Sequence, residues 1–199
     1  MKKLLIATRN RGKFPEIVSK LKGLPFEFLD LNDVLLGDYE VEESAMSFEG
    51  NAIIKSIIFG KSTELLTLAD DSGLEVDALQ GRPGVYSARY APGTDEERYK
   101  KLLGELENVP DNERGAQFRC VVAIYDPQGD KVRICEGIYR GKIKKEPQGS
   151  NGFGYDPIFY NEDLKKTNAE MSTEEKNSVS HRGRALKKAC EILEKEFLN

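Results

Sequence analysis

The sequence predicts an α/β protein in which helices flank a mixed β-sheet, and two observations carry this prediction. An apolar segment, Lys3 to Thr8, has the composition of a buried strand and leads directly into a helical pattern. Two further strand-like segments, Ala116 to Tyr125 and Lys131 to Arg140, follow one another across the turn sequence DPQGD. A strand–helix unit together with a hairpin predicts a sheet with both parallel and antiparallel strands.

The composition is that of a soluble globular protein with one domain, residues 1–199. Hydrophobic residues make up 39% of the 199 residues and charged residues 32%, so the chain can bury a core and is not disordered. The formal net charge of −4 argues against a broad nucleic-acid or membrane-binding face, so neither partner is expected.

Two features predict a cytoplasmic protein. The N-terminal segment MKKLLIATRN has too few consecutive apolar residues for a signal sequence or a membrane span. The three cysteines, Cys120, Cys135 and Cys190, are widely spaced and odd in number, as expected of reduced thiols.

The first strand is followed by the turn TRNRGK and by a helix predicted over Lys13 to Lys22, with Phe14, Ile17 and Leu21 on its apolar face. The first N–H groups of a helix are free to bind an anion, so this turn is a candidate phosphate site. It lacks the GxxxxGK[ST] pattern of a P-loop. An ordinary strand-to-helix turn is the alternative.

A second strand, Phe26 to Leu31, precedes the acidic loop GDYEVEES, which contains Glu40, Glu42 and Glu43. Such a loop is usually a solvated surface, but it could supply a carboxylate to a metal. Ser47 is then predicted to cap a helix, with Glu49 in its first turn.

That helix places four isoleucines on one face: Ile53, Ile54, Ile57 and Ile58. Asn51 and Lys55 are four residues apart and share another face, where a polar pair usually meets solvent.

Next comes an apolar run, Leu65 to Leu68, which ends abruptly at the adjacent carboxylates Asp70 and Asp71. We expect these at the end of a strand, where open α/β proteins place their chemistry. Two carboxylates need a compensating cation, and a hard ion such as Mg²⁺ prefers oxygen ligands. A solvated Asp-Asp-Ser-Gly turn is the alternative.

The remaining segments continue the α/β pattern. Thr94 is predicted to cap a helix that includes Tyr99 and Leu102. Met171 to Lys176 is predicted to contain a short helical piece that begins at Ser172. The glycine-dense loop GSNGFGYDP contains Phe153 and Tyr155, which could present a ring to a flat ligand or pack in the core.

A final helix starts after Ser180, and the only histidine, His181, stands at its beginning beside Arg182. A lone histidine is more often structural than catalytic, and a zinc site is not expected.

Together these residues describe a site for a nucleoside triphosphate. Acidic groups suit Mg²⁺, the TRNRGK turn suits phosphates, and the glycine–aromatic loop suits a planar base. No serine elbow, Cys–His pair or GxGxxG motif is present. The chemistry expected is attack of water on a phosphate, with a carboxylate as the base and Mg²⁺ neutralising charge.

Five segments, in this order, are similar to the successive motifs of the inosine triphosphate pyrophosphatase family. They extend from residue 6 to residue 186 and are IATRNRGKFPEI, SFEGNAIIKS, ADDSGLEVDALQGRPGVYSARYA, GFGYDPIF and AEMSTEEKNSVSHRGRAL. The resemblance implies an elongated α/β homodimer whose two lobes surround a nucleotide cleft. It also implies Mg²⁺-dependent conversion of ITP, dITP and XTP to the monophosphate and pyrophosphate, which clears deaminated purines from the nucleotide pool.

The resemblance also implies roles for individual residues. The phosphates would be held by the loop of Thr8, Arg9, Asn10, Arg11, Gly12 and Lys13. Asp71 would accept the proton of the attacking water, bind the metal, or both, and Glu40 or Glu43 would be a second metal ligand. The base and the rest of the substrate would be bound by Ser72, Phe153, Gly154, Tyr155, Asp156, Lys176, His181 and Arg182.

Donors such as Lys176, His181 and Arg182 would suit the 6-oxo group of hypoxanthine and xanthine, because the 6-amino group of adenine would face another donor. The chain departs from the family pattern at Arg9, where glycine is common, and at Gly50, where an acidic residue is common. Two alternatives stay open: a pyrophosphatase for dTTP-like, UTP-like or modified nucleotides, and a non-catalytic nucleotide-binding module.

Overall fold

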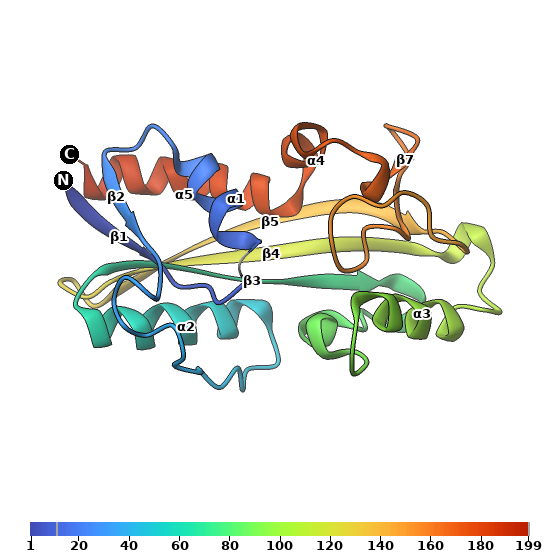
Figure 1. Cartoon of the computed structure of the whole chain (residues 1–199), viewed down its shortest axis with the longest axis horizontal. Helices are drawn as coiled ribbons and strands as arrows, with labels where there is room; N and C mark the ends of the chain where they lie inside the picture. Colours follow the sequence, from blue (N-terminus) through green and yellow to red (C-terminus); the bar gives the residue numbers. More distant parts are fainter. Residues whose placement is uncertain (11, 199) are drawn as a thin grey trace. The chain divides into compact units, whose positions relative to one another are not determined.

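The computed structural model describes residues 1–10 and 12–198, so the predicted phosphate contact Arg11 lies outside the described residues. Figure 1 labels most of the helices and strands. In chain order they are β1 (Lys2–Ile6), α1 (Lys13–Leu21), β2 (Phe26–Leu29), α2 (Phe48–Thr63), β3 (Leu66–Val76), α3 (Asp95–Glu105), β4 (Gly115–Asp126), β5 (Lys131–Ile143), β6 (Phe159–Asn161), β7 (Lys166–Thr167), α4 (Thr173–Val179) and α5 (His181–Phe197).

The described strands form one seven-stranded sheet in the order β2-β1-β3-β4-β5-β6-β7. Strand β1 is parallel to both β2 and β3, whereas β6 is antiparallel to both β5 and β7. The predicted mixed sheet, flanked by helices, is therefore confirmed. No helix among the residues described is long and apolar enough to span a membrane.

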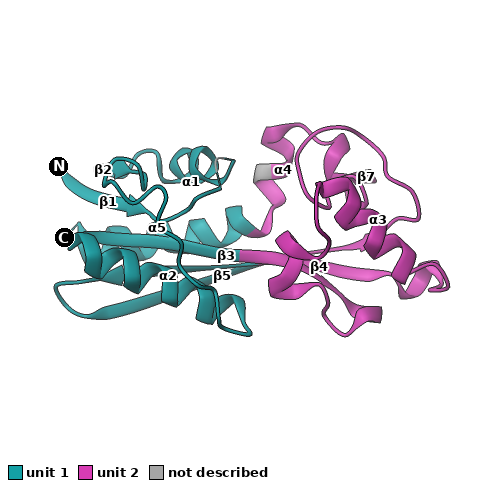
Figure 2. Ribbon diagram, turned by 60° about the horizontal axis from the view of Figure 1, so that its bottom comes forward, with its two compact units in different colours: residues 1–71, 120–137, 182–199 teal, residues 72–119, 138–181 magenta. Residues whose placement is uncertain are grey.

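The chain divides into two compact units, coloured separately in Figure 2. Unit 1 comprises Met1–Asp71, Cys120–Gly137 and Arg182–Asn199, and unit 2 comprises Ser72–Arg119 and Ile138–His181. Each unit has its own apolar core. That of unit 2 is built around Leu74, Leu102, Tyr139 and Phe159.

In unit 1 the sheet buries a different core on each face. Alternate residues of a strand point to opposite faces. Leu4 and Ile6 of β1 accordingly join the core covered by α1 and α5, which includes Ile17, Leu21, Leu186 and Leu193. Leu5 and Ala7 join a second core that includes Phe59 of α2.

Side-chain caps fix the starts of three helices, and the sequence predicts the caps of the first two. Ser47 accepts a hydrogen bond from the N–H of Gly50 at the start of α2. Thr94 and Ser172 form complete capping boxes with Glu97 and Glu175 at the starts of α3 and α4. Each such cap satisfies N–H groups that lack a partner in the first turn.

Strand β3 corrects the expectation that a strand ends at Asp70. It runs without interruption from Leu66 to Val76, so both carboxylates lie in mid-strand. The strand that ends beside them is β1, whose last paired residue, Ile6, is opposite Leu68.

Helix α2 turns its small and polar side to the protein interior. Its buried residues include Asn51, Ala52, Ser56 and Gly60. A Cβ atom on Gly60 would lie only 2.4 Å from a ring carbon of Tyr125, so the helix packs too closely here for a larger side chain. The four isoleucines of α2 are only partly buried.

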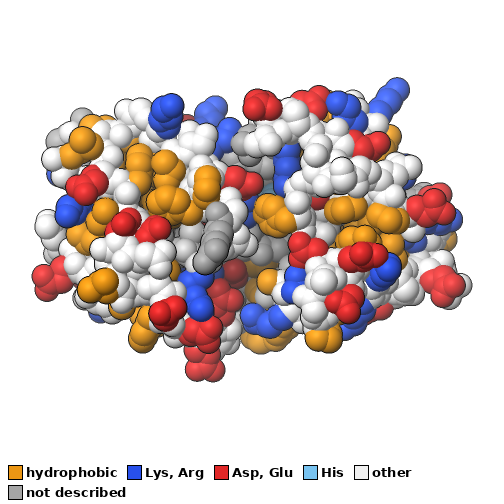
Figure 3. Space-filling view, in the orientation of Figure 1, with side chains coloured by type: hydrophobic (Ala, Val, Ile, Leu, Met, Phe, Trp, Pro, Cys, Tyr) orange, Lys and Arg blue, Asp and Glu red, His pale blue; other side chains and the backbone are white. Residues whose placement is uncertain are grey.

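On the face of the molecule shown in Figure 3, acidic and basic side chains are intermixed.

Candidate active site

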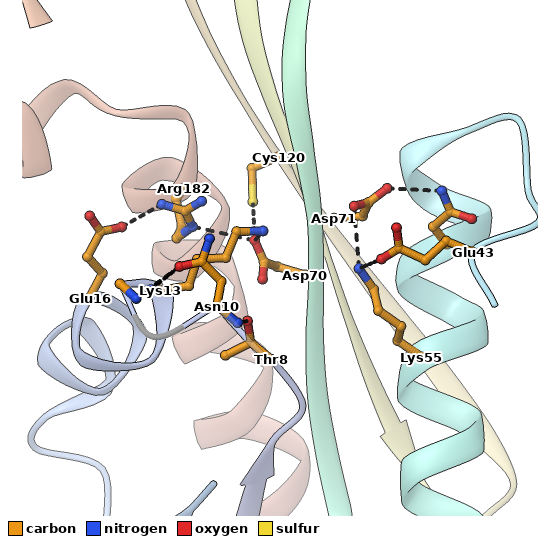
Figure 4. Close-up of polar contacts among 12 residues, drawn as sticks. Thr8, Asn10, Lys13, Glu16, Glu43, Lys55, Asp70, Asp71, Cys120 and Arg182 are labelled. Carbon is orange, nitrogen blue, oxygen red and sulfur yellow. Dashed lines mark hydrogen bonds and ion pairs between the residues drawn. The ribbon is translucent and has the colours of Figure 1, made fainter. Parts of the chain in front are cut away.

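Asp70 and Asp71 point to opposite faces of β3 (Figure 4). Asp70 is on the side of Leu68 and of the core covered by α1 and α5, while Asp71 is on the side of Ala69 and of α2. The strand period of two dictates this separation. The two carboxylates therefore work in different surroundings rather than as one pair.

Asp70 lies in a cluster of cations. Its side chain is almost completely buried, and its Oδ2 lies 2.9 Å from Lys13 Nζ and 3.4 Å from Arg182 Nε. Burial alone would raise the pKa of Asp70, but the charges of Lys13, Arg182 and Lys55 lower that pKa well below its usual range. Asp70 is thus ionised at neutral pH.

Arg182 is buried between two acidic groups. Besides Asp70, its guanidinium contacts Glu16 of α1, with 2.5 Å between Nη1 and Oε2. Burial would lower the pKa of Arg182, but Asp70, Cys120 and Glu16 raise it above its usual value. Arg182 was expected at the purine edge together with Lys176. Its guanidinium instead pairs with Asp70 and Glu16, both in unit 1.

The phosphate-loop candidates are organised by Asn10. Its side-chain oxygen accepts hydrogen bonds from the N–H groups of Gly12 (2.9 Å) and Lys13 (3.3 Å). Its own N–H donates to Thr8 Oγ1 at 3.3 Å. Two N–H groups that were expected to be free for an anion are therefore already bonded. Lys13 brings the positive charge of its Nζ beside Asp70.

On the other face of β3, Asp71 is held by two residues of α2. Asn51 Nδ2 donates to Asp71 Oδ2 at 3.2 Å, and Lys55 Nζ lies 3.4 Å from Asp71 Oδ1. Lys55 Nζ also lies 2.7 Å from Glu43 Oε1. The side-chain oxygen of Asn51 accepts the N–H of Ala45, which fixes the end of the acidic loop. One ammonium group thus joins Asp71 to Glu43.

The pKa of Asp71 shifts in the opposite direction from that of Asp70. Burial raises it, the charge of Lys55 lowers it, and repulsion by Glu43 raises it again, so that the net pKa lies above the usual value. Burial lowers the pKa of Lys55, but Asp71, Asp70 and Glu43 together raise it. A carboxylate with a raised pKa is a better proton acceptor, and such groups cluster at functional sites.

Glu40, the other candidate from the acidic loop, lies elsewhere. It pairs with Arg9, with 2.5 Å between Oε1 and Nη1, and the two side chains are 78% and 47% exposed. Surface pairs of this kind contribute little to stability. Of the two glutamates, only Glu43 shares a cation with Asp71.

In unit 2, Asp156 is the hub of the glycine-dense loop. Its buried carboxylate accepts the N–H of Phe153 (2.8 Å), Asn168 Nδ2 (3.1 Å) and Lys176 Nζ (2.6 Å). Lys176 Nζ lies 4.6 Å from the ring centroid of Phe153. The Phe153 ring is 43% exposed, so it is available to a flat ligand rather than packed in the core.

The other predicted contacts have distinct places. The hydroxyl of Tyr155 donates to the carbonyl of Ser87 at 2.9 Å, and this residue is buried in the core of unit 2. The His181 ring is buried and stacks on Phe118 with 4.9 Å between centroids. Ser72, next to Asp71 in β3, is partly buried.

Sequence reasoning missed the roles of Asn51, Lys55 and Glu16. Asn51 is completely buried, although a polar pair on a helix was expected to meet solvent. The available signal was the spacing of four residues, which places both side chains on one face toward Asp71. Glu16 lies three residues beyond the predicted loop, and no sequence signal marks it as the partner of Arg182.

Comparisons with known proteins find relatives that match nearly the whole chain. A family model described as the Ham1 family matches residues 4–192. A dITP/XTP pyrophosphatase of Desulforamulus reducens is 48% identical over 99% of this chain and 98% of its own length, and one of Geobacter sulfurreducens is 50% identical over 94% of each. A solved HAM1 protein from Coxiella burnetii superposes with a TM-score of 0.90 at 42% identity, over 97% of this chain and 98% of that one.

Proposed function

This chain belongs to the Ham1 family, and on that premise we propose that it hydrolyses non-standard purine nucleoside triphosphates (ITP, dITP and XTP) to the monophosphate and pyrophosphate. The observation that carries the proposal is the unequal pair in β3. Two cations keep Asp70 ionised, whereas Asp71 has a raised pKa and lies beside a further carboxylate and a lysine. The first arrangement suits charge neutralisation and the second suits proton transfer.

In this reaction Asp71 accepts the proton of the attacking water. The water oxygen forms a bond to one of the two phosphorus atoms of the α–β anhydride. The bond between that phosphorus and the bridging oxygen breaks, and the bridging oxygen stays with the other phosphorus, so that the monophosphate and pyrophosphate separate. Asn51 orients the Asp71 carboxylate through its hydrogen bond. Lys13, Thr8, Asn10 and Arg9 contact the phosphates, and Lys13 reaches them from its position beside Asp70.

The donor set of unit 1 fits a divalent metal that arrives with its substrate. Asp71 and Glu43 offer carboxylate oxygens, and both already pair with the ammonium group of Lys55. No group of three acidic, histidine or cysteine side chains that could hold a metal occurs in the described part of the chain. Mg²⁺ usually takes one or two carboxylates and completes its shell with phosphates and water, so Asp71 and Glu43 would hold it. When bound, it would neutralise charge on the phosphates.

We assign the purine base to unit 2. Phe153 stacks on the base, and Gly154, Tyr155 and Asp156 shape the backbone around it. Lys176 is held by Asp156 next to the ring and donates to an oxo group of the base. His181 supports this region through its stack on Phe118, Ser72 contacts the substrate, and the Arg182 side chain keeps Asp70 ionised.

We also propose that the protein is a homodimer and that α2 lies at its interface. The isoleucines Ile53, Ile54, Ile57 and Ile58 are half-buried, and none belongs to the core clusters found among the described residues. A helix whose side away from its own sheet is apolar favours burial of that side against a second subunit. Sedimentation velocity should show a dimer that Ile54→Lys dissociates. Ile134→Lys, on β5, should leave the dimer intact; monomeric wild-type protein would contradict the proposal.

The activity is tested by measuring pyrophosphate release from ITP, dITP, XTP, GTP, ATP, dTTP and UTP, with Mg²⁺ and with a chelator. We expect the three non-standard purine nucleotides to be turned over fastest, and only with the metal. Faster turnover of dTTP or UTP would identify a different pyrophosphatase. Binding of ITP without any release would identify a non-catalytic nucleotide-binding module.

A further inference from the structure

Both peptide N–H groups that flank the Phe153 side chain are held by carboxylates. The N–H of Phe153 donates to Asp156 Oδ2 at 2.8 Å, and the N–H of Gly154 donates to Asp95 Oδ2 at 2.7 Å. Asp156 belongs to the same loop. Asp95 is the first residue of α3 and lies 59 positions away in the sequence. The loop is therefore hydrogen-bonded to α3 at the residue that follows Phe153.

Asp95 is itself fixed. Its second oxygen, Oδ1, lies 2.5 Å from Arg98 Nη1, and Arg98 Nη2 donates to the carbonyl of Gly93 at 2.8 Å. The capping box of Thr94 and Glu97 defines the start of the helix on either side. Asp95 Oδ1 thus pairs with Arg98, and Asp95 Oδ2 accepts the hydrogen bond from the Gly154 N–H.

The Phe153 ring depends on this backbone for its orientation. The ring is 43% exposed and does not belong to the described core of unit 2, so core packing does not fix it. Gly154 has a φ of +64°, a conformation open to glycine, so the peptide could adopt other arrangements without its hydrogen bond. A hydrogen bond to an ionised acceptor is stronger than a neutral one.

We propose that Asp95 is a positioning residue for base recognition: it fixes the Gly154 peptide and thereby holds the Phe153 ring in the orientation that stacks on the purine. The proposal rests on the proposed function, because it takes Phe153 as the base contact. Asp95 touches neither the phosphates nor Asp71 in this role. It should therefore affect affinity for the base and not the chemical step.

The test compares Asp95→Ala, Asp95→Asn, Phe153→Ala and the double variant Asp95→Ala/Phe153→Ala, with IMP formation from ITP followed by chromatography. Glu96→Ala is the matched control, because it removes the neighbouring first-turn charge, whose partner is Lys100. We expect Asp95→Ala to raise KM for ITP by about fivefold to tenfold with kcat within about threefold, since the lost bond is charge-assisted but partly exposed. Asp95→Asn keeps an acceptor for Gly154 and should stay within about twofold of wild type.

Two readouts separate positioning from a general loss of structure. The inhibition constant of pyrophosphate, which has no base, should be unchanged in Asp95→Ala, and Asp95→Ala should add nothing to the KM of Phe153→Ala. Equal weakening of pyrophosphate, or full additivity in the double variant, would overturn the proposal. A normal KM in Asp95→Ala with a raised KM in Phe153→Ala refutes the role of Asp95 alone. A normal KM in Phe153→Ala refutes the base contact and with it the role of Asp95, whereas absence of IMP formation by the wild-type protein would refute the proposed function.

Discussion

Asp70 and Asp71 are neighbours in β3, yet their carboxylates face opposite sides of the strand and have pKa values shifted in opposite directions. The cause lies in what each face supplies. The buried carboxylate of Asp70 meets Lys13 and Arg182, whereas Asp71 meets one lysine that it shares with Glu43. This difference is the basis of the proposed roles, in which Asp70 is a counter-ion and Asp71 accepts a proton.

The first prediction concerns stability. Asp70→Asn leaves the charges of Lys13 and Arg182 without their shared buried partner, so we expect the free energy of unfolding to fall by about 3–5 kcal/mol. Denaturant unfolding measures this. Asp71→Asn is the control in the next position: because burial disfavours its charge, its neutral analogue should be at least as stable as wild type. Equal losses in the two variants would contradict the separate roles.

The second prediction is the pH dependence of that difference. The pKa of Asp70 is lowered in the folded state, so its stabilising contribution is complete above its unfolded pKa of about 3.9 and disappears as the pH falls toward the folded value. The difference in unfolding free energy between wild type and Asp70→Asn should stay constant from pH 8 to about pH 5. It should shrink below about pH 4. A gap that closes between pH 8 and pH 6 would show that Asp70 is not the titrating group.

The third prediction separates binding from chemistry. Asp71→Asn keeps the size of the side chain and can still hydrogen-bond Asn51, but it cannot accept the proton of the attacking water. We expect kcat for ITP to fall by about 10²- to 10⁴-fold, the range typical of a lost general base. ITP binding, measured by calorimetry, should remain detectable. Undiminished turnover would remove Asp71 from the mechanism.

Much of the fold could be predicted because its signals are local. The caps Ser47, Thr94 and Ser172 mark helix starts within a few residues of sequence, and the DPQGD turn marks the hairpin. The full length of β3 could not be predicted, because the residues around Asp70 and Asp71 have the sequence of a turn. The strand continues through them because Lys13 and Lys55 compensate their charges, and those residues are far away in the chain.

The same reasoning explains which candidate site residues the sequence could name. Candidates inside recognisable motifs, such as Lys13, Asp71 and Phe153, could be named from the sequence. The choice between Glu40 and Glu43 required the position of Lys55, which is a three-dimensional fact. The partners of Arg182 likewise depend on how α5 packs on α1, and no periodicity in the sequence encodes that contact.

The fourth prediction concerns the cation between Asp71 and Glu43. Lys55→Met removes the ammonium group but keeps the length of the side chain, so two carboxylates then face each other without compensation. We expect the variant to have a lower Tm than wild type in a chelator, and to gain more Tm from Mg²⁺, because a ligand that binds only the folded state stabilises it. Lys61→Met, which loses only an exposed pair with Asp130, is the control. An equal Tm gain in both variants and wild type would argue against a metal at this place.

The fifth prediction tests the glycine-dense loop. Gly149 has a φ of +81°, and a Cβ atom there would lie 2.4 Å from both the carbonyl carbon and the carbonyl oxygen of Ala169. Gly149→Ala therefore meets both backbone strain and a clash with main-chain atoms that cannot rotate away. We expect it to lower the free energy of unfolding by at least about 2 kcal/mol and to raise KM for ITP, because the loop that carries Phe153 must shift.

Gly104→Ala is the control for that substitution. Gly104 lies within α3, its added Cβ would have nothing within 4 Å, and alanine is the better helix former by about 1 kcal/mol. The same chemical change should therefore stabilise the protein at one position and destabilise it at the other. If Gly149→Ala were as stable as wild type, with an unchanged KM, the contact with Ala169 would not hold the loop in place.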